Sequence, residues 1–303
     1  MQYSRIPGTE LTVSKICLGT MTFGSPVGET DAVRLVRYAR EKGINFVDTA
    51  NMYEGYNRYA GSHGGVAEEI VGKAIQGARQ DYIVATKLGM KVGTEPVDEF
   101  TSPEAIRVQL RRSLARLSTD YVDLYYLHRY DPNTAPGEIA RAIGQELKAG
   151  TIRAWGVSNY SRDQLAALLA AAREENIAPP AMCQPPLSLL NTGALDALIP
   201  FCAENGVGVI PYQALQGGLL SGKYRRGMEP PAGSRAAEKP DWVKPMTDEM
   251  WAVLESTEKA AAAAGQTMVQ YALSWALHQP GVVSTLIGVK RESQIDEAAG
   301  AAV

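Results

Sequence analysis

The sequence has few of the features that mark disulfide-linked, zinc-binding or secreted proteins. Only three of its 303 residues are cysteines, Cys17, Cys183 and Cys202. They are widely separated and form neither a CxxC pair nor a cysteine–histidine spacing suited to zinc. We therefore expect reduced structural thiols, no metal site and a cytoplasmic location.

Long apolar runs and a strong charge excess are also missing. No uninterrupted stretch of about 18 apolar residues predicts a membrane span, and the start MQYSRIPGTE does not read as a signal peptide. The formal charge of -3 and the pI near 5.8 argue against a nucleic-acid or polybasic membrane surface. Without a GxGxxG motif, a Rossmann domain is not indicated. A small molecule is the expected partner.

Short β-branched or aromatic runs alternate with longer amphipathic segments along the chain. An opening hairpin (3–6 and 11–14) precedes eight such runs. They span residues 15–18, 45–48, 82–87, 121–128, 154–158, 181–184, 208–212 and 283–287. This alternation predicts an α/β fold of the (β/α)8 TIM barrel type with an N-terminal β-hairpin, formed as a single domain by residues 1–303.

Capping signals mark where the intervening helices begin and end. The expected N-caps are Thr30, Ser102, Ser161 and Thr247, and the expected left-handed glycines after helices are Gly43, Gly150 and Gly206. Two long loops, 55–65 and 217–244, follow the second and seventh strands. Loops at that end of a barrel usually build the active site.

Polar residues stand at the carboxyl ends of these strands, where packing alone would favour apolar ones. Asp48 ends the second strand with Tyr53 in the loop beyond it, Lys87 ends the third and His128 ends the fourth. An ion pair and a buried histidine would explain each residue separately, but four on consecutive strands favour a shared site.

These four residue types suit the reduction of a carbonyl group. A phenol with its ordinary pKa of about 10 exchanges protons poorly near neutrality. A neighbouring ammonium, itself held by a carboxylate, favours the phenolate and makes the tyrosine a tunable acid. A histidine N–H would stabilise negative charge on the carbonyl oxygen during hydride attack.

The chain resembles the aldo-keto reductases from residue 5 to residue 301. The resemblance is carried by the motifs DTANMY (48–53), ATKLG (85–89), STDYVDLYYLHRYDP (118–132), GTIRAWGVSN (150–159), GGLLSGKY (217–224) and LIGVKRESQ (286–294). It implies a catalytic tetrad of Asp48, Tyr53, Lys87 and His128, with Tyr53 as the general acid. It also implies that Ser158, Asn159 and Gln184 hold a nicotinamide carboxamide and that Tyr212 stacks on its ring.

The remaining cofactor residues are expected after the seventh and eighth strands. The segment from Gly217 to Lys223 nearly spells a P-loop, but Tyr224 stands where a Ser or Thr would bind magnesium, so an NTPase is not indicated. The resemblance instead makes it a backbone-lined segment near the pyrophosphate. Cations at the start of a helix after strand eight favour NADP over NAD. The expected contacts are Leu215, Gly217, Leu219, Gly288, Lys290, Arg291, Gln294 and Glu297.

Loop residues at the same end are candidates for the substrate pocket. They are Met21, Phe23, Tyr56, Tyr59, Arg129 and Tyr130, which would make an aromatic pocket with a cation at its rim. The expected substrate is an aldehyde, ketone or keto-sugar. Two alternatives stay open: a non-catalytic NADP(H)-binding regulatory subunit of the same fold, and a lyase or isomerase using Lys87 as a Schiff base. Asp48 and Tyr53 argue against the latter because they favour a charged lysine.

Overall fold

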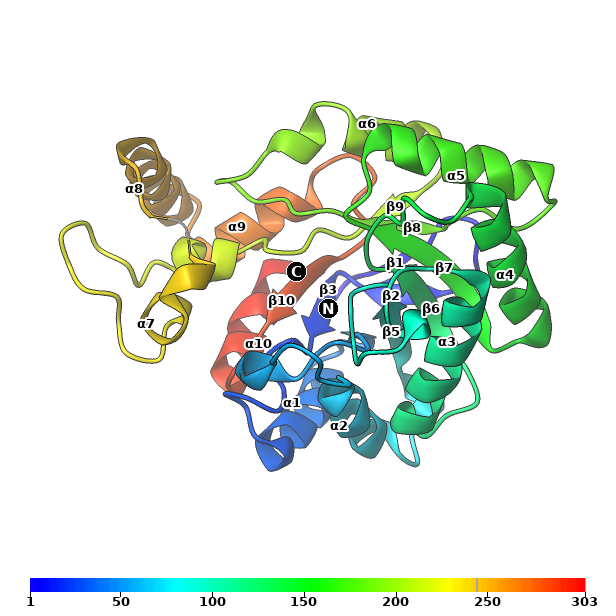
Figure 1. Cartoon of the computed structure of the whole chain (residues 1–303). Coiled ribbons are helices and arrows are strands. Elements are labelled where there is room, and N and C mark those ends of the chain that lie inside the picture. Colours follow the sequence, from blue (N-terminus) through cyan, green and yellow to red (C-terminus); the bar gives the residue numbers. More distant parts are fainter. Residues whose placement is uncertain (244, 303) are drawn as a thin grey trace.

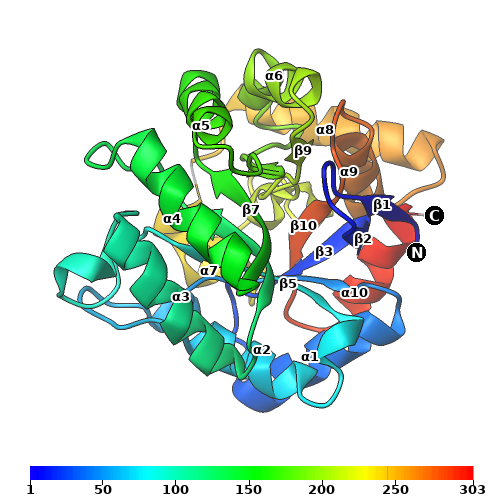
Figure 2. The ribbon, with the colours of Figure 1, turned by 90° about the vertical axis from the view of Figure 1, so that its right-hand side faces the viewer.

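Eight parallel strands form a sheet that closes on itself. The computed structural model describes residues 1–243 and 245–302, and its sheet runs in the order β10-β3-β4-β5-β6-β7-β8-β9. The strands are β3 (Ile16–Gly19), β4 (Phe46–Asp48), β5 (Ile83–Leu88), β6 (Val122–Leu127), β7 (Ile152–Ser158), β8 (Met182–Gln184), β9 (Gly208–Val209) and β10 (Thr285–Gly288). Hydrogen bonds from Val209 N to Gly281 O (2.9 Å) and from Leu286 N to Pro211 O (3.0 Å) close the circle. The predicted (β/α)8 barrel is confirmed (Figures 1 and 2).

Helices surround this barrel, as Figure 2 shows. Those that follow successive strands are α1 (Glu29–Glu41), α2 (Val66–Ile75), α3 (Pro103–Leu117), α4 (Pro136–Ala149), α5 (Arg162–Glu174), α6 (Leu198–Glu204), α9 (Met268–Leu277) and α10 (Glu292–Ala299). Two more, α7 (Arg235–Glu238) and α8 (Asp248–Ala263), belong to the long segment between β9 and α9 and stand to one side (Figure 1). The predicted loop 217–244 lies within this segment and includes α7. Residue 244 of that loop and residue 303 of the predicted domain lie outside the described residues. No helix of the described part is long and apolar enough to cross a membrane.

Most of the predicted helix starts are confirmed. The side chains of Ser102, Ser161 and Thr247 each accept a hydrogen bond from the backbone N–H three residues on. The predicted start at Thr30 is wrong, because α1 is capped by the extended residue Gly28 and has Glu29 in its first turn, where an acidic side chain complements the helix dipole.

The predicted strand 208–212 is also longer than β9, which ends at Val209. Beyond it, Pro211 has no N–H to donate to a sheet ladder. The hydrogen bond that its carbonyl oxygen accepts from Leu286 N therefore joins the two segments there (3.0 Å).

Alternate residues of the strands fill the inside of the barrel. The buried apolar residues of this inner cluster are Ile6, Leu11, Val13, Cys17, Phe46, Ala85, Leu124, Tyr126, Ala154, Ala181, Met182, Ile210 and Val283. A Cβ on Gly156 would lie 2.7 Å from the Tyr126 ring, so the glycine leaves room for that ring. The first three members come from the hairpin of β1 (Tyr3–Arg5) and β2 (Thr12–Ser14) and its connection. The predicted hairpin therefore closes the amino-terminal end of the barrel.

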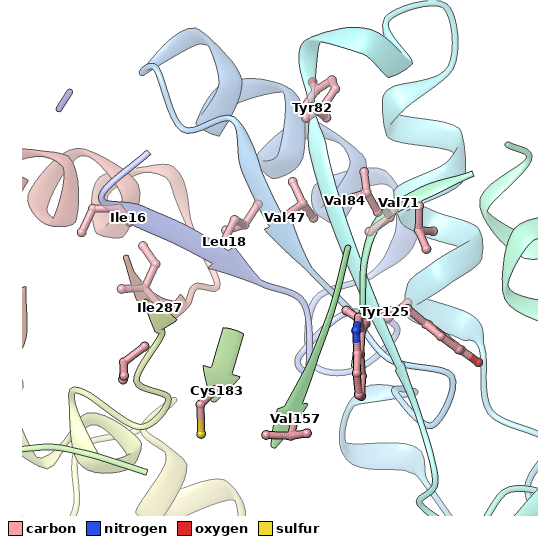
Figure 3. Packing of buried hydrophobic residues seen from close by; sticks show 14 of the residues in the cluster. Ile16, Leu18, Val47, Val71, Tyr82, Val84, Tyr125, Val157, Cys183 and Ile287 are labelled. Carbon is pink, nitrogen blue, oxygen red and sulfur yellow. The ribbon is translucent and has the colours of Figure 1, made fainter. Parts of the chain in front are cut away.

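The outward-facing strand residues pack under the helices and form the larger core. Leu18, Val47, Val84 and Val157 belong to it together with helix residues such as Val71 (Figure 3). Each fully buried aliphatic side chain of this kind contributes about 1.5–3 kcal/mol relative to an exposed one. Successive strand residues are therefore buried alternately in the inner and the outer core. This alternation determines which residues face inward.

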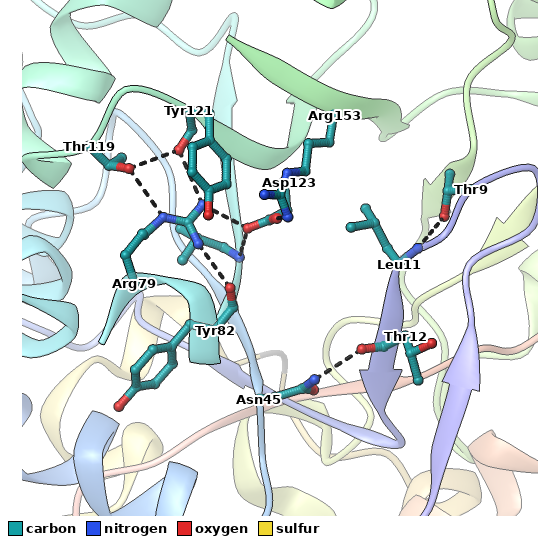
Figure 4. A network of polar contacts seen from close by, with 11 residues as sticks. Thr9, Leu11, Thr12, Asn45, Arg79, Tyr82, Thr119, Tyr121, Asp123 and Arg153 are labelled. Carbon is teal, nitrogen blue, oxygen red and sulfur yellow. Dashed lines mark hydrogen bonds and ion pairs between the residues drawn. The ribbon is translucent and has the colours of Figure 1, made fainter. Parts of the chain in front are cut away.

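A polar network ties the strands together at the amino-terminal end (Figure 4). The buried carboxylate of Asp123 accepts hydrogen bonds from Arg79 Nη2 (2.7 Å), Arg153 Nη1 (2.9 Å) and Val84 N (2.9 Å). Both guanidinium groups also lie over the Tyr121 ring, at 4.1 and 4.2 Å from its centroid. Asp123 is thus fully paired, which a buried charge requires.

Candidate active site

At the carboxyl ends of β4, β5 and β6 the inward side chains change from apolar to polar. Asp48, Lys87 and His128 each stand two positions after an inward apolar residue and so point to the same side of the sheet. Those apolar residues are Phe46, Ala85 and Tyr126. All three polar side chains are buried. The strand period therefore gathers them at one mouth of the barrel.

A line of hydrogen bonds joins Asp48, Lys87 and Tyr53. The Lys87 ammonium donates to Oδ1 of Asp48, to the Thr49 carbonyl oxygen (2.8 Å) and to the Tyr53 hydroxyl (3.3 Å). Lys87 is completely buried, as is Asp48. All three ammonium hydrogens are used, so the lysine is held in position with its charge directed at the phenol.

The surroundings act on the pKa of both the lysine and the phenol. Burial lowers the pKa of Lys87, but the charges of Asp48 and Tyr53 outweigh this effect and raise it above its ordinary value. Burial raises the pKa of Tyr53, against the lowering effect of the Lys87 charge. At neutral pH the lysine is therefore charged and the phenol carries its proton.

The ring of His128 lies beside that of Tyr53. The two rings meet edge-on, with centroids 5.9 Å apart and an interplanar angle of 81°. Burial, and then the charges of Lys87, Arg129 and Arg58, place the pKa of His128 well below its ordinary value. Its Nδ1 is buried without a hydrogen-bond partner among the described residues. His128 is thus a neutral imidazole beside the phenol, able to donate one N–H.

The residues expected to hold a carboxamide are linked to this group. Gln184 donates from Nε2 to Oδ2 of Asp48 (2.9 Å), and Ser158 donates to the Gln184 carbonyl oxygen (2.9 Å). Asn159 takes a left-handed backbone conformation (φ 58°), donates from Nδ2 to the His128 carbonyl oxygen (2.8 Å) and accepts at Oδ1 from the Tyr212 hydroxyl (2.7 Å). The structure brings all four together beside the tetrad.

The segment after β9 turns sharply as it leaves the barrel. Gly217 and Gly218 both have positive φ (64° and 96°), within the 3-10 turns of Gln216–Ser221. A Cβ on Gly218 would lie 3.1 Å from Lys223 Nζ, so the glycines let the backbone fold close to that cation. Leu215 is half-buried and Leu219 is buried.

Cations from two segments gather near this turn. The pKa of Lys223 is lowered by partial burial and then by the positive charges of Lys290, Arg291 and Arg235, against the opposite effect of Glu238. The Lys290 ammonium donates to Glu238 and to the Gly233 carbonyl oxygen (2.9 Å). We call the four basic residues the cation cluster. The sequence prediction named only Lys290 and Arg291; the lysine of the GGLLSGKY motif was the available signal for Lys223.

The other residues predicted for the cofactor run from the end of β10 into α10. Gly288 ends β10, with open space where a Cβ would be. Gln294 accepts at Oε1 from Lys290 N (2.7 Å), and Arg291 donates from Nε to the Ser293 hydroxyl (3.1 Å). Glu297 is half-buried. This part of the prediction therefore falls on one continuous turn and helix.

The predicted substrate residues do not all reach the mouth. Phe23 is completely buried in the outer core, because the loop that carries it folds down onto the helices. Tyr56 is covered by Trp242, with ring centroids 5.4 Å apart, and lies near the cations of α7 and Lys290. Met21 is half-buried. Tyr59 is exposed, and Tyr130 packs edge-on against Tyr160. Arg129 lies beside His128 in the chain.

Comparisons with known proteins agree with this arrangement. The family model described as "Aldo/keto reductase family" matches residues 15–303. "Aldo-keto reductase YhdN" of Bacillus subtilis is 32% identical, over 98% of this chain and 87% of its own length. A "Probable voltage-gated potassium channel subunit beta" of Arabidopsis thaliana is 30% identical, over 98% and 90%. The solved structure of a glycerol dehydrogenase from Gluconobacter oxydans superimposes with a TM-score of 0.81 at 31% identity, over 98% of this chain and 89% of that one. The chain belongs to the aldo-keto reductase family of oxidoreductases.

Proposed function

We propose that the chain reduces aldehydes, ketones or keto-sugars with NADPH and that Tyr53 is the general acid. The observation that carries this proposal is the buried line from Asp48 through Lys87 to the Tyr53 hydroxyl, with the neutral ring of His128 beside it. The buried ion pair of Asp48 and Lys87 does not require a tyrosine hydroxyl for its stability. The Tyr53 hydroxyl instead offers a positioned proton where a carbonyl oxygen would gain negative charge.

Bound NADPH would supply the hydride. As the carbonyl carbon accepts it, the π electron pair moves to the oxygen, which takes the proton of Tyr53. Lys87 stabilises the phenolate that remains, and Asp48 keeps Lys87 charged. His128 donates an N–H to the same oxygen and so orients the carbonyl. Tyr53 regains a proton from solvent after the product alcohol leaves.

The residues present fit a phosphorylated dinucleotide. Gln184, Ser158 and Asn159 offer amide and hydroxyl groups suited to a carboxamide, and Tyr212 offers an aromatic face. The glycine turn at Gly217–Gly218 exposes backbone. Beside it, the four positive charges of the cation cluster exceed the single negative charge of Glu238, which pairs with Lys290, and this favours NADP over NAD.

The test is the oxidation of NADPH, followed by its absorbance, with a panel of aldehydes, ketones and keto-sugars. We expect turnover that falls by at least about 100-fold in Tyr53→Phe while NADPH still binds. Tyr125→Phe is the matched control, because Tyr125 is a buried tyrosine of the outer core whose hydroxyl has no partner among the described residues. Equal activity in Tyr53→Phe and wild type would refute the role of Tyr53.

A non-catalytic subunit is the second candidate, since one relative is described as a potassium channel subunit. It predicts NADPH binding without turnover on any carbonyl of the panel. The intact line of Asp48, Lys87 and Tyr53 favours the enzyme. We further propose a cytoplasmic location, where reducing conditions keep thiols such as the three free, buried cysteines reduced.

A further inference from the structure

Two arginines stand beside the catalytic residues and are not used by the proposed reaction. Arg129 directly follows His128 in the chain. Arg58 donates from Nη1 to the carbonyl oxygen of Met52 (2.8 Å), the residue before Tyr53. Arg129 is thus the chain neighbour of His128, and the Arg58 guanidinium is bonded to the backbone beside Tyr53. We call Arg58 and Arg129 the rim pair.

The Arg129 guanidinium is held in place, but not all of its N–H groups have a hydrogen-bond partner. Its Nη2 donates to Oε1 of Glu99 (2.5 Å), and its guanidinium lies 4.5 Å from the centroid of the Phe100 ring. Its Nε is buried and has no hydrogen-bond partner among the described residues. Leaving a buried N–H of a charged group without an acceptor costs free energy. A ligand that supplied an acceptor to Arg129 Nε would therefore be favoured.

Arg58 has no acidic partner at all within the described part of the chain. Its two hydrogen bonds go to carbonyl oxygens, those of Met52 and Lys91, and no described carboxylate lies within 4.0 Å of it. In contrast, the half-buried Arg79, Arg116 and Arg129 each pair with an acid. The full positive charge of Arg58 therefore remains available to a ligand.

The balance of charge around the rim pair is positive. Glu99 is shared between Arg129 and Lys91, with the Lys91 ammonium at 3.9 Å. Glu54, in the same loop as Arg58, accepts a hydrogen bond from the Ser62 hydroxyl. Both charges of the rim pair act on the imidazole of His128 in addition to the effect of its burial. Their field therefore reaches the place where the carbonyl would react.

We propose that the rim pair binds an anionic group of the substrate, a carboxylate or a phosphate, carried a few bonds from the carbonyl. This inference rests on the proposed reductase function and names its substrate class. Planar guanidinium groups bind such oxyanions with paired, charge-assisted hydrogen bonds. Binding of the anionic group would fix the distance between the carbonyl of the same substrate and the Tyr53 hydroxyl. The anionic group would therefore both select the substrate and orient it.

The test compares matched aldehydes that differ only in charge: succinic semialdehyde against butanal, and glycolaldehyde phosphate against glycolaldehyde. For wild type we expect kcat/KM at least about 10-fold higher for an anionic member than for its neutral partner. In Arg129→Met and in Arg58→Met we expect that advantage to disappear, while kcat/KM for the neutral partner changes less than about threefold. Whichever pair shows the advantage identifies the anion as carboxylate or phosphate.

Arg153→Met is the matched control. Arg153 also pairs with a carboxylate and stacks on an aromatic ring, those of Asp123 and Tyr121, but at the opposite end of the barrel. We expect it to preserve the preference for the anionic aldehyde. Equal kcat/KM for charged and neutral aldehydes in wild type would overturn the inference. So would an equal loss on both in the rim variants, since the arginines would then only support the loops.

A binding measurement separates this inference from the proposed function. If no carbonyl is reduced at all, the reductase proposal fails, and calorimetric titration of glycerol phosphate, butyrate and glycerol into the protein with NADP then tests the rim pair directly. Binding of an anion but not of glycerol, lost in Arg129→Met and kept in Arg153→Met, would support the site. Absence of binding by either anion would overturn it.

Discussion

Gln184 donates a hydrogen bond from its side-chain Nε2 to Oδ2 of Asp48, at 2.9 Å. The other oxygen of that carboxylate accepts from Lys87, which in turn reaches Tyr53. A residue proposed to hold the cofactor amide therefore shares a buried carboxylate with the residue proposed to tune the acid. This shared carboxylate predicts that cofactor binding and proton transfer are coupled.

Replacing Gln184 by Met is expected to affect both processes. The substitution keeps the volume but removes a hydrogen bond to a charged group, which is worth about 1.5–3 kcal/mol. We expect the dissociation constant of NADPH to rise by about 10-fold or more and the reduction rate at saturating NADPH to fall as well. Fluorescence titration and steady-state kinetics measure the two effects. In the control Gln109→Met, which removes a buried amide bonded to Asp98, neither should change as much; a weaker affinity with an unchanged rate in Gln184→Met would contradict the coupling.

The rate of reduction is expected to be independent of pH across neutrality. Burial raises the pKa of Tyr53, so the phenol keeps its proton up to about pH 10 and loses it only in stronger alkali. Because His128 has a pKa well below its ordinary value, no change in rate should appear near pH 6.5. A pH profile of kcat/KM checks both statements. A fall in reduction rate between about pH 6 and 8 would show that a different group donates the proton.

His128 also makes the stability of the fold depend on pH. Its pKa is depressed in the folded state, so the unfolded chain binds the proton more tightly. Stability is then fully present above the ordinary pKa of about 6.5 and is lost as the pH falls from there toward the folded pKa, by up to about 1.4 kcal/mol per pH unit. Urea unfolding at several pH values should show this slope in wild type, and it should shrink in His128→Asn. Identical slopes in the two proteins would assign the effect to other groups.

Asp123 is expected to be a major source of stability rather than of activity. Its carboxylate is completely buried and satisfies two guanidinium groups and a backbone N–H. Asp123→Asn leaves Arg79 and Arg153 without their counter-charge, which costs about 3–5 kcal/mol when a buried pair is broken. Chemical denaturation measures the loss. The exposed pair of Arg162 and Asp163 is the contrast, because Asp163→Asn should change stability by less than about 1 kcal/mol.

The cation cluster is expected to distinguish NADPH from NADH. Replacing Arg235 by Met removes one of the three positive charges that act on Lys223. We expect the KM for NADPH to rise by about 10-fold while that for NADH changes less than about twofold. Arg226→Met is the control, since Arg226 lies in the same loop but pairs with the exposed Asp248. An equal rise in KM for NADPH and NADH would show that the cation cluster does not bind the phosphate that distinguishes the two cofactors.

That Asp48, Tyr53, Lys87 and His128 lie together could be predicted from the sequence, because each lies close to a strand whose period is clear. Asp48 and Lys87 follow an inward apolar residue at a spacing of two, which places them at the mouth once the strands are recognised. Side-chain caps such as Ser161 and Thr247 were also readable, since the cap and its partner lie within one turn.

Contacts between distant loops could not be predicted in this way. Trp242 packs on Tyr56, and Arg235 acts on Lys223 near Lys290, because the segment after β9 folds back across the barrel mouth. The pattern of apolar residues does not reveal the course of this segment. The sequence therefore predicted Tyr56 to be a substrate residue and gave no role to Arg235 or Lys223. Arg58 was likewise missed, since its significance depends on the absence of an acidic neighbour in space rather than on any motif.

The pairing of β10 with β3 has a consequence for how the chain is made. Thr285 lies opposite Ile16, and Ser284 donates to the Ser14 carbonyl oxygen (2.8 Å), so the edge of the first barrel strand is completed by the last. During synthesis on the ribosome that edge stays unpaired until residues 285–288 have emerged, and the hairpin cannot yet pack into a closed barrel. Such late, non-local closure folds slowly, and an unpaired strand edge is a site for aggregation. Newly made chains therefore have a period of exposure in which a chaperone would matter most.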